Sequence, residues 1–445
     1  LVAARACARL RDAGGAAAPT ADRASELAVA AAAALNDSNH HDAAAEILGD
    51  LGSHPVELRD AAVVEALRAA LALGDRAYVE VVLAFALPLL DTMQGASAVR
   101  ARGLLAALER WSGDDLGLAA KAREQLEVAR SGSERSHAAM LVALASYGHD
   151  VGGLAEWLDV AREEAARDGE LSSELEAART LVMVQMAVGR TDEGRALARQ
   201  CTARAEEVGE EGWALEFRTL DMLSRFYDDV DRDEVLSWLS YVRTAPVRLE
   251  TRAYSTNSLA VALADGGDAV RSAEILEPWL APERMEGFDP LVQGIITWGA
   301  VQRAWILGDL TEAVRRARWA TERIPTGFPT LAGTQVIWRW AEYELGVPVT
   351  APHPQGGFTD SAAREARALD LLVDGQPRPA AAAFADAGES WRPVLRRSWH
   401  RCRRAAGDSL AVAGDQDEAL EVLEALDRDL VACGFLALRP RVRAS

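Results

Sequence analysis

The sequence predicts an all-α fold in which helical hairpins stack into an α–α superhelix. Three observations lead to this prediction. The apolar residues make up 49% of the chain and are mainly alanine and leucine, which favour helix over strand. Amphipathic stretches of roughly 13 to 18 residues follow one another along the chain, a length typical of globular helices. Turn residues separate these stretches with a period of about 39 residues.

The predicted turns each contain a glycine or an aspartate. They lie at Asp37, Gly74, Gly113, Gly148, Gly189, Asp228, Gly267, Gly308, Gly346, Gly375 and Gly414. Successive turns are 35 to 41 residues apart, except that only 29 residues separate Gly346 from Gly375. A single hairpin cannot cover its own apolar face, so each one stacks on the next. We therefore expect about ten to eleven helical pairs.

The repeat is clearest over residues 298–325, where Gly308 and Asp309 turn the chain and Pro325 ends the second helix. Three small residues of that helix are expected to pack closely: Ala313, Ala317 and Ala320. Small residues at these offsets from a turn glycine, closed by a proline, resemble the tetratricopeptide repeat (TPR). The period here is longer than the roughly 34 residues of that family, so the resemblance is to a long, degenerate TPR-like class.

Breaks in the pattern divide the chain into four parts. An orphan helix and linker are expected over residues 1–22, and the main superhelix over 23–345. A loop rich in proline and glycine follows at 346–359, and C-terminal helical hairpins occupy 360–445. The chain begins without methionine and stops abruptly at "RPRVRAS", so we expect it to be a fragment of a longer protein.

Composition argues against several classes of protein. A net charge of −20 opposes binding of nucleic acid by this chain itself, because a phosphate backbone requires a basic surface. The longest apolar run, "VVLAFALPLL", has ten residues and contains Pro88, whereas a membrane-spanning helix needs about 20. The four cysteines are far apart and fit reduced thiols better than a disulfide framework or a zinc site. We therefore predict a cytoplasmic protein that contacts no membrane.

The motifs of common catalytic sites are missing. Lys121 is the only lysine and does not follow a glycine-rich loop, so no Walker A motif is present. The sequence "NDSNHHD" at 36–42 could supply metal ligands, but its residues are also those that turns and N-caps prefer. We favour the turn. His400 and Cys402 would point in different directions on a helix, so they do not suggest a catalytic pair. We expect no catalytic residue, metal or cofactor.

Aromatic and amide residues recur on one face of successive predicted first helices. In TPR-type superhelices the first helix of each pair lines the concave groove, and transferring that pattern from the turn glycines predicts seven ligand-binding residues. They are Trp298, Gln302, Trp305, Trp340, Tyr343, Tyr254 and Asn257. Such a wall would suit a planar, partly polar ligand or a partner peptide. Packing between neighbouring helices is the alternative for each aromatic residue.

Two stretches carry a resemblance to a known family: "ALEVLEALDRDLVACG" within the last 65 residues, and "ELAVAAAAALNDSNHHDAAAEILGDL" near the start. The last 65 residues look like the segment before the DNA-binding helix-turn-helix of large ATP-binding LuxR-type regulators, and the early stretch is similar to the first sensor repeats of that family. The resemblance implies a sensor module of a transcriptional regulator that binds a small-molecule effector or partner protein in its groove, with possible homo-oligomerisation. DNA would be contacted only through a domain outside this fragment.

Two other classes stay open. A TPR-like protein–protein interaction scaffold with no small-molecule ligand is the main alternative. An enzyme with dispersed carboxylates in its groove is the other, although nothing in the residue spacing supports it.

Overall fold

The structure of the chain is a computed structural model in which nearly all regular structure is helical. It describes residues 21–444 apart from 38–39, 74, 91, 94, 110–122, 125, 128, 130, 146–150, 226–231, 245–246, 289, 325–328 and 355–359. Within these ranges there is no β-strand, and a single isolated antiparallel bridge joins Asp75 to Phe288. The predicted all-α class is confirmed.

The N-terminal half contains helices of 8 to 18 residues. They are α2 (Ala21–Asp37), α3 (His41–Leu48), α4 (Val56–Leu73), α5 (Arg76–Ala86), α6 (Gly95–Glu109), α8 (Gly132–Ala145), α9 (Val151–Asp168), α10 (Leu171–Ala187), α11 (Thr191–Glu207), α12 (Glu211–Arg225) and α13 (Arg232–Thr244). Short 3₁₀ turns follow α3 at Leu51–Ser53 and α5 at Leu87–Leu89.

The C-terminal half continues the array. Its helices are α14 (Leu249–Asp265), α15 (Ala269–Leu276), α16 (Pro282–Gly287), α17 (Pro290–Ile306), α18 (Leu310–Arg323), α19 (Pro329–Glu344), α20 (Ser361–Val373), α21 (Pro377–Trp391), α22 (Arg396–Ala413), α23 (Gln416–Ala432) and α24 (Arg439–Ala444). Two 3₁₀ turns, η4 (Glu277–Trp279) and η5 (Leu436–Leu438), follow α15 and precede α24.

Six of the predicted turn glycines adopt a left-handed backbone, with φ between 68° and 90°. They are Gly189, Gly267, Gly308, Gly346, Gly375 and Gly414. At Gly308 the amide N–H groups of Gly308 and Asp309 donate to the carbonyls of Trp305 (3.1 Å) and Ala304 (2.9 Å), which closes the end of α17. The Asp309 carboxylate then accepts from the amide of Glu312 and caps α18. Turns predicted at Gly74, Gly113, Gly148 and Asp228 lie outside the described residues.

Small residues let the helices approach one another, as predicted for the unit around Gly308. Ala313, Ala317 and Ala320 are all buried on α18, which packs between α17 and α19. Pro325, predicted to end that helix, lies outside the described residues.

Near the start of the chain, α2 begins at Ala21, so the last two residues of the predicted linker are helical. Asp22 in the first turn complements the helix dipole there.

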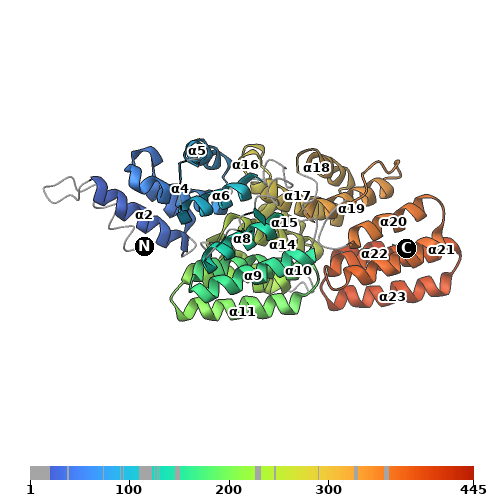
Figure 1. Ribbon diagram of the computed structural model, residues 1–445. Helices are drawn as coiled ribbons and strands as arrows, with labels where there is room; N and C mark the ends of the chain where they lie inside the picture. Colours follow the sequence, from blue (N-terminus) through green and yellow to red (C-terminus); the bar gives the residue numbers. More distant parts are fainter. Residues whose placement is uncertain are drawn as a thin grey trace.

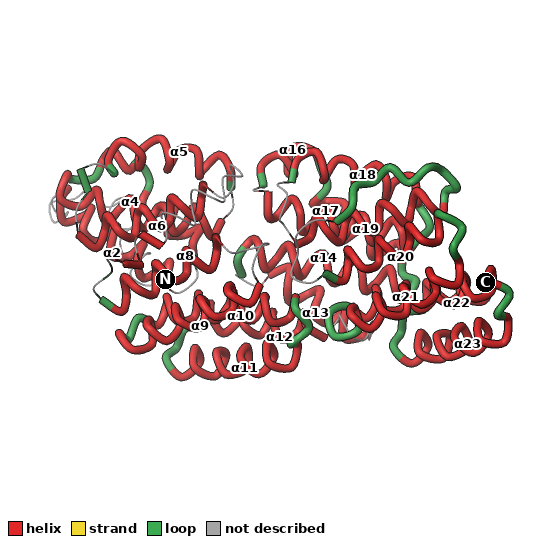
Figure 2. Tube along the Cα trace, turned by 45° about the vertical axis from the view of Figure 1, so that its right-hand side comes forward, coloured by secondary structure: helices red, strands yellow, loops and turns green. Residues whose placement is uncertain are grey.

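The array is elongated, with α2 at one end and α20–α23 at the other, and α14 lies between them in both views (Figure 1, Figure 2). Between its ends the chain curves back on itself. Helix α4 packs against α14, and the Asp75–Phe288 bridge joins the start of α5 to the segment just before α17. The superhelix therefore closes around the space enclosed by its N-terminal repeats.

The segment that follows α19, residues 346–354, is not helical. It is held by Glu342, whose carboxylate accepts from the Thr350 amide (2.6 Å), the Thr350 hydroxyl (2.7 Å) and the Ala351 amide (2.9 Å). Arg339 donates to the carbonyl of Ala351 at 2.7 Å. These bonds fix the loop against α19, and α20 packs on the same helix beyond it. The remainder of the predicted loop, 355–359, is outside the described residues.

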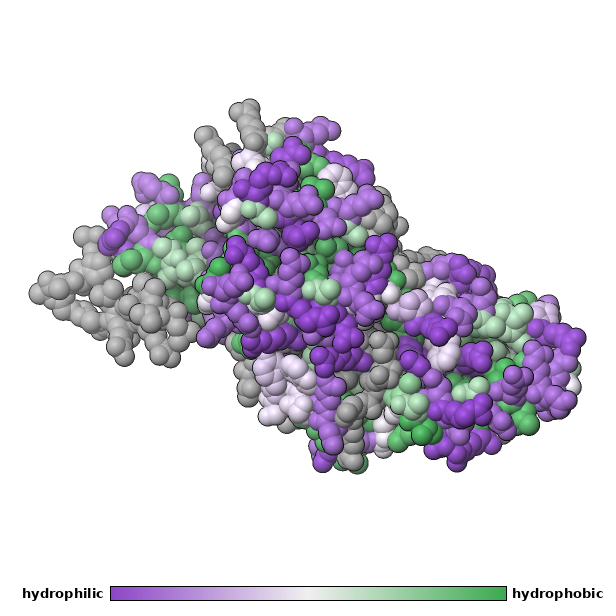
Figure 3. Space-filling view, turned by 90° about the horizontal axis from the view of Figure 1, so that it is seen from below, coloured by the Kyte–Doolittle hydropathy of each residue, from purple (hydrophilic) through white to green (hydrophobic). Residues whose placement is uncertain are grey.

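None of the described helices has both the length and the apolar character that a membrane span requires. Hydrophilic residues cover most of the face seen in Figure 3, and its hydrophobic residues lie in small separate groups. Such groups are ordinary for a protein surface and do not mark a docking area on this face.

Candidate ligand-binding site

The seven residues predicted to form a recognition wall lie on α14, α17 and α19. Four of them are almost completely buried: Asn257, Gln302, Trp305 and Trp340. The other three are partly buried against the hydrophobic core. Tyr254 packs on one cluster of buried residues, and Trp298 and Tyr343 pack on another. The burial of these four side chains, Asn257, Gln302, Trp305 and Trp340, fits the alternative of packing between neighbouring helices.

Close packing between successive first helices explains part of this burial. The side chain of Asn257 on α14 occupies the position that a Cβ atom on Gly299 of α17 would need. The indole of Trp298 lies in the same way over Gly333 of α19, within 2.7 Å of where a Cβ would stand. These two glycines are what allow the large side chains to fit between neighbouring helices.

Arginines from the C-terminal part cover the rest of the face. Arg397 donates to the Gln302 side chain at 3.3 Å and to the Asp265 carboxylate at 2.7 Å. The guanidinium of Arg441 lies 4.9 Å from the centre of the Trp305 ring and donates to the Trp305 carbonyl at 2.7 Å. Arg401 and Arg404 also lie over this ring, at 5.5 and 5.9 Å. The face is filled by the chain itself.

A fully buried carboxylate completes this region. Glu365 accepts from Arg401 at 2.5 and 2.7 Å and from the indole N–H groups of Trp340 (2.6 Å) and Trp391 (2.7 Å). We call the buried contacts of Arg397, Arg401 and Arg404 with Asp265, Glu365 and Glu344 the α22 network. Ligand binding by the seven predicted residues stays a prediction. For the four buried residues, binding would require the α22 network to open and expose them.

A cavity of about 610 Å³ lies instead in the N-terminal half, within the size range of small-ligand sites. Apart from His41 at the start of α3, the helical residues that line it come from α2, α4, α6, α8, α10, α14 and α17. Each of these helices precedes a turn predicted from the sequence. The TPR-like premise that first helices line a concave groove stays a prediction, and the residues that line this cavity are not those predicted.

One wall of the cavity comes from α2, α3 and α4. Arg68 donates to Asp37 at 2.7 Å, to Glu65 at 2.9 Å and, across the cavity, to the Ser172 hydroxyl of α10 at 3.1 Å. Asn36 donates to Glu65, and its side-chain oxygen lies 2.9 Å from Nδ1 of His41. The bond to Ser172 ties the first repeats to a helix about a hundred residues further on.

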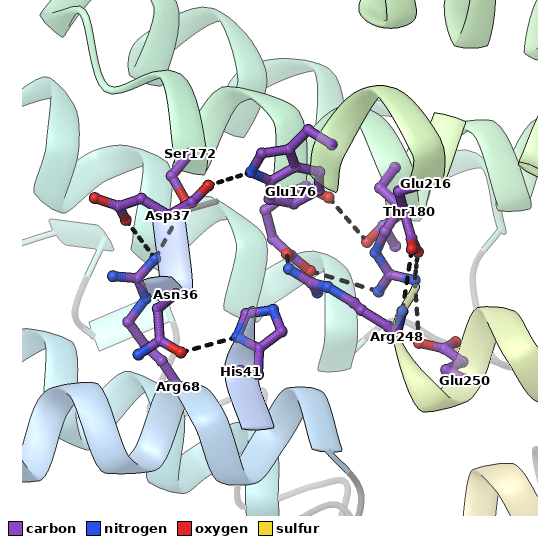
Figure 4. Close-up of polar contacts among 12 residues, drawn as sticks. Asn36, Asp37, His41, Arg68, Ser172, Glu176, Thr180, Glu216, Arg248 and Glu250 are labelled. Carbon is purple, nitrogen blue, oxygen red and sulfur yellow. Dashed lines mark hydrogen bonds and ion pairs between the residues drawn. The ribbon is translucent and has the colours of Figure 1, made fainter. Parts of the chain in front are cut away.

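The opposite wall comes from α10 and the start of α14, and Figure 4 shows the two walls facing each other. Arg179 donates to Glu250 at 3.2 Å, and Arg248 pairs with Glu176. The guanidinium of Arg248 lies over the Trp213 ring, whose N–H donates to the backbone carbonyl of Asp37. A third contact pairs Arg100 with Glu170 at 3.0 Å. We call these charged residues of both walls the cavity network.

The surroundings of the cavity lower the pKa of both Glu176 and His41, which favours the charged form of Glu176 and the neutral form of His41. Burial alone would raise the pKa of Glu176, but the charges and hydrogen bonds of Arg248 and Arg179 outweigh it and lower that pKa to about 2. Burial and the nearby Arg248, Arg68 and Arg179 hold the pKa of His41 well below its usual range. Glu176 is therefore ionised and His41 neutral at pH 7.

The metal alternative for "NDSNHHD" finds no support in the described residues, which contain no group of three or more side chains arranged to hold an ion. The segment ends α2 and begins α3, as the turn interpretation requires, with Ser38 and Asn39 outside the description. Sequence reasoning missed that Asp37 and His41 reach the cavity. The one signal was the concentration of polar residues at that turn.

His400 and Cys402 also form no pair. His400 lies 2.5 Å from the Asp429 carboxylate, and burial lowers its pKa to about 4. Cys402 is completely buried, and burial raises the pKa of its thiol. The described cysteines Cys201, Cys402 and Cys433 are buried and are not joined to one another by a disulfide; Cys7 is outside the described residues.

Neither a protein-family model nor a curated protein matches this sequence.

Proposed function

We propose that the chain is a sensing module that binds an effector in the cavity of its N-terminal repeats. The cavity is the observation that carries the proposal. It combines a suitable volume with charged and apolar side chains supplied by many first helices, so one bound molecule would contact several repeats at once. A ligand that bridges repeats favours one curvature of the superhelix over others.

Helix α14 supplies a physical route for coupling. Its first turn carries Glu250, which lines the cavity and pairs with Arg179. Its last residue, Asp265, pairs with Arg397 of α22. Most of the helix between them is buried. A displacement of α14 on ligand binding would therefore reach the α22 network, which is how an effector signal would be passed to the C-terminal hairpins.

The wider setting we propose is that of a transcriptional regulator similar to the large LuxR-type proteins, with DNA binding in another domain. The alternative is an interaction scaffold that binds only proteins. In both cases the recognition surface lies inside the superhelix, so the two differ in the size of the bound molecule.

A thermal-shift screen of metabolites and short peptides, repeated with a cavity-filling variant, tests the proposal. Leu104 lines the cavity on α6, and Leu104→Trp should abolish any shift found with the native protein. Leu420→Trp on α23 is the matched control, since Leu420 is exposed and distant from the cavity lining. Hits that bind both variants equally well would disprove the cavity as the effector site. Absence of any hit, with protein partners co-purifying, would favour the scaffold.

A further inference from the structure

The charges that line the cavity are of both signs. Four arginines face six carboxylates: Arg68, Arg100, Arg179 and Arg248, with Asp37, Glu65, Glu170, Glu176, Glu210 and Glu250. Neither wall is uniform. Arg68 stands beside Asp37 and Glu65 on one wall, and Arg179 beside Glu250 on the other. A ligand in this space therefore meets donors and acceptors within a short distance on each side.

A ligand of a single charge sign would be matched poorly. A polyphosphate or nucleic acid would place its charges against Glu250 and Asp37, and a polyamine would approach Arg68 and Arg179. Like charges brought together across an interface cost several kcal/mol. Neighbouring arginines lower the pKa of Glu176, and neighbouring carboxylates raise the pKa of Arg179, so the electrostatic potential inside the cavity has both signs.

Apolar side chains form much of the remaining lining. Among them are Leu71, Leu104, Met140, Leu141, Leu249 and Val292. Ser172 and Ser173 at the start of α10 add hydroxyl groups. The lining thus offers apolar contacts, hydroxyl groups and charged groups of both signs.

We propose that the cavity binds a short peptide whose amino and carboxyl ends are both free. Such a ligand carries one positive and one negative group on a body with amide acceptors and apolar side chains, which corresponds to the mixed lining. A few residues fit a volume of about 610 Å³. This inference rests on the proposed function, since it names the class of molecule sensed at the same site.

Isothermal titration with four forms of one tripeptide, Leu-Ala-Leu, tests the inference. The forms are the free peptide, the N-acetyl peptide, the C-terminal amide and the doubly capped peptide, which share one body and differ in their end charges. The free peptide should bind at least about tenfold more tightly than either singly capped form, and the doubly capped form most weakly. The difference should shrink at high salt, because it is electrostatic.

Two variants locate the binding. Arg100→Gln removes a cavity charge whose side chain is 36% exposed, and should weaken binding of the free tripeptide about fivefold or more. Arg76→Gln removes an arginine of similar type from the exposed Arg76–Glu80 pair outside the lining, and should leave binding unchanged.

Equal affinity for all four forms, weakened by Leu104→Trp, would overturn the zwitterion inference while leaving an effector cavity in place. Binding of none of the four forms would also overturn it, and the metabolite screen would then decide the proposed function separately. Equal weakening by Arg100→Gln and Arg76→Gln would place the peptide elsewhere on the protein and would overturn the inference too.

Discussion

The cavity network and the α22 network are built from the same kinds of residue, but different side chains lie between their ion pairs. Both join arginines and carboxylates from distant parts of the chain, through Arg179 and Glu250 in one and Arg397 and Asp265 in the other. In the α22 network the space between the ion pairs is filled by large rings, namely Trp305, Trp340, Trp391 and Phe384. The apolar residues that line the cavity are smaller: leucines, valines, alanines, a methionine and Gly103.

The charges therefore do not determine whether a pocket forms here. The volume of the side chains between them does, because aromatic rings supply the bulk that closes a gap between helices. A stripe of tryptophans on a repeat protein can therefore indicate where the interior is filled. The open part of the superhelix is where such rings are scarce.

The largest effect is expected in the α22 network. Arg401→Met would leave the Glu365 carboxylate buried without its charged partner, and removing one member of a buried pair costs about 3–5 kcal/mol. Urea unfolding should show this loss as a lower midpoint. Adding Glu365→Gln should restore part of the stability, because the remaining group is then neutral. An Arg401→Met protein as stable as the native one would show that the pair contributes no net stability.

The second prediction concerns pH and compares His400 on α22 with Glu176 of the cavity network. The folded-state pKa of His400, about 4, is below the ordinary value near 6.5, so its stabilising contribution is complete above pH 6.5 and is lost as pH falls toward 4. The loss is on the order of 3 kcal/mol. Glu176 also has a lowered pKa, about 2, so its contribution is lost only between about pH 4.5 and 2.

Hydrogen exchange at pH 7, 5 and 4 should therefore show α22 and α23 losing protection before α10 does. The variant His400→Gln should flatten the response between pH 6.5 and 4 and leave the lower range unchanged. Simultaneous loss of protection in all three helices would contradict independent titration of His400 and Glu176.

The smallest effect on stability is expected at the rim of the cavity. The Arg100–Glu170 pair has about a third of each side chain exposed, so Arg100→Gln should change the free energy of unfolding by less than about 1 kcal/mol. Its effect on peptide binding is expected to be larger than its effect on stability. A loss of stability as large as that of Arg401→Met would mean that the two networks do not differ in the way described.

Much of the fold was predictable because the responsible signals are local. A turn glycine at Gly308 or Gly414, followed by an alanine-rich amphipathic stretch, specifies a hairpin through neighbouring residues alone. The face shared by Trp298, Gln302 and Trp305 was predictable for the same reason, since helical periodicity sets it. What covers that face was not, because Arg397 and Arg441 come from about 95 to 136 residues further along the chain.

The cavity was unpredictable for a related physical reason. Its two walls meet only because the superhelix curves enough to bring α4 against α14, and that curvature is the sum of small rotations between many hairpins. The residues that then face each other, Arg68 and Ser172, have no sequence relation to one another. The polar turn at Asn36, Asp37 and His41 could be assigned as a turn, but its position beside the cavity depends on that long-range closure.

Closure also changes how this array should fold. In an open solenoid each repeat touches only its neighbours, so stability is nearly a sum of local contributions and the ends fray independently. Here Arg68–Ser172 spans 104 positions and Arg397–Asp265 spans 132, and both contacts depend on elements near the middle of the chain. Forming them costs loop entropy that only a largely assembled chain recovers. Refolding should therefore be slower, and unfolding more nearly all-or-none, than in a repeat protein of equal length whose ends never meet its centre.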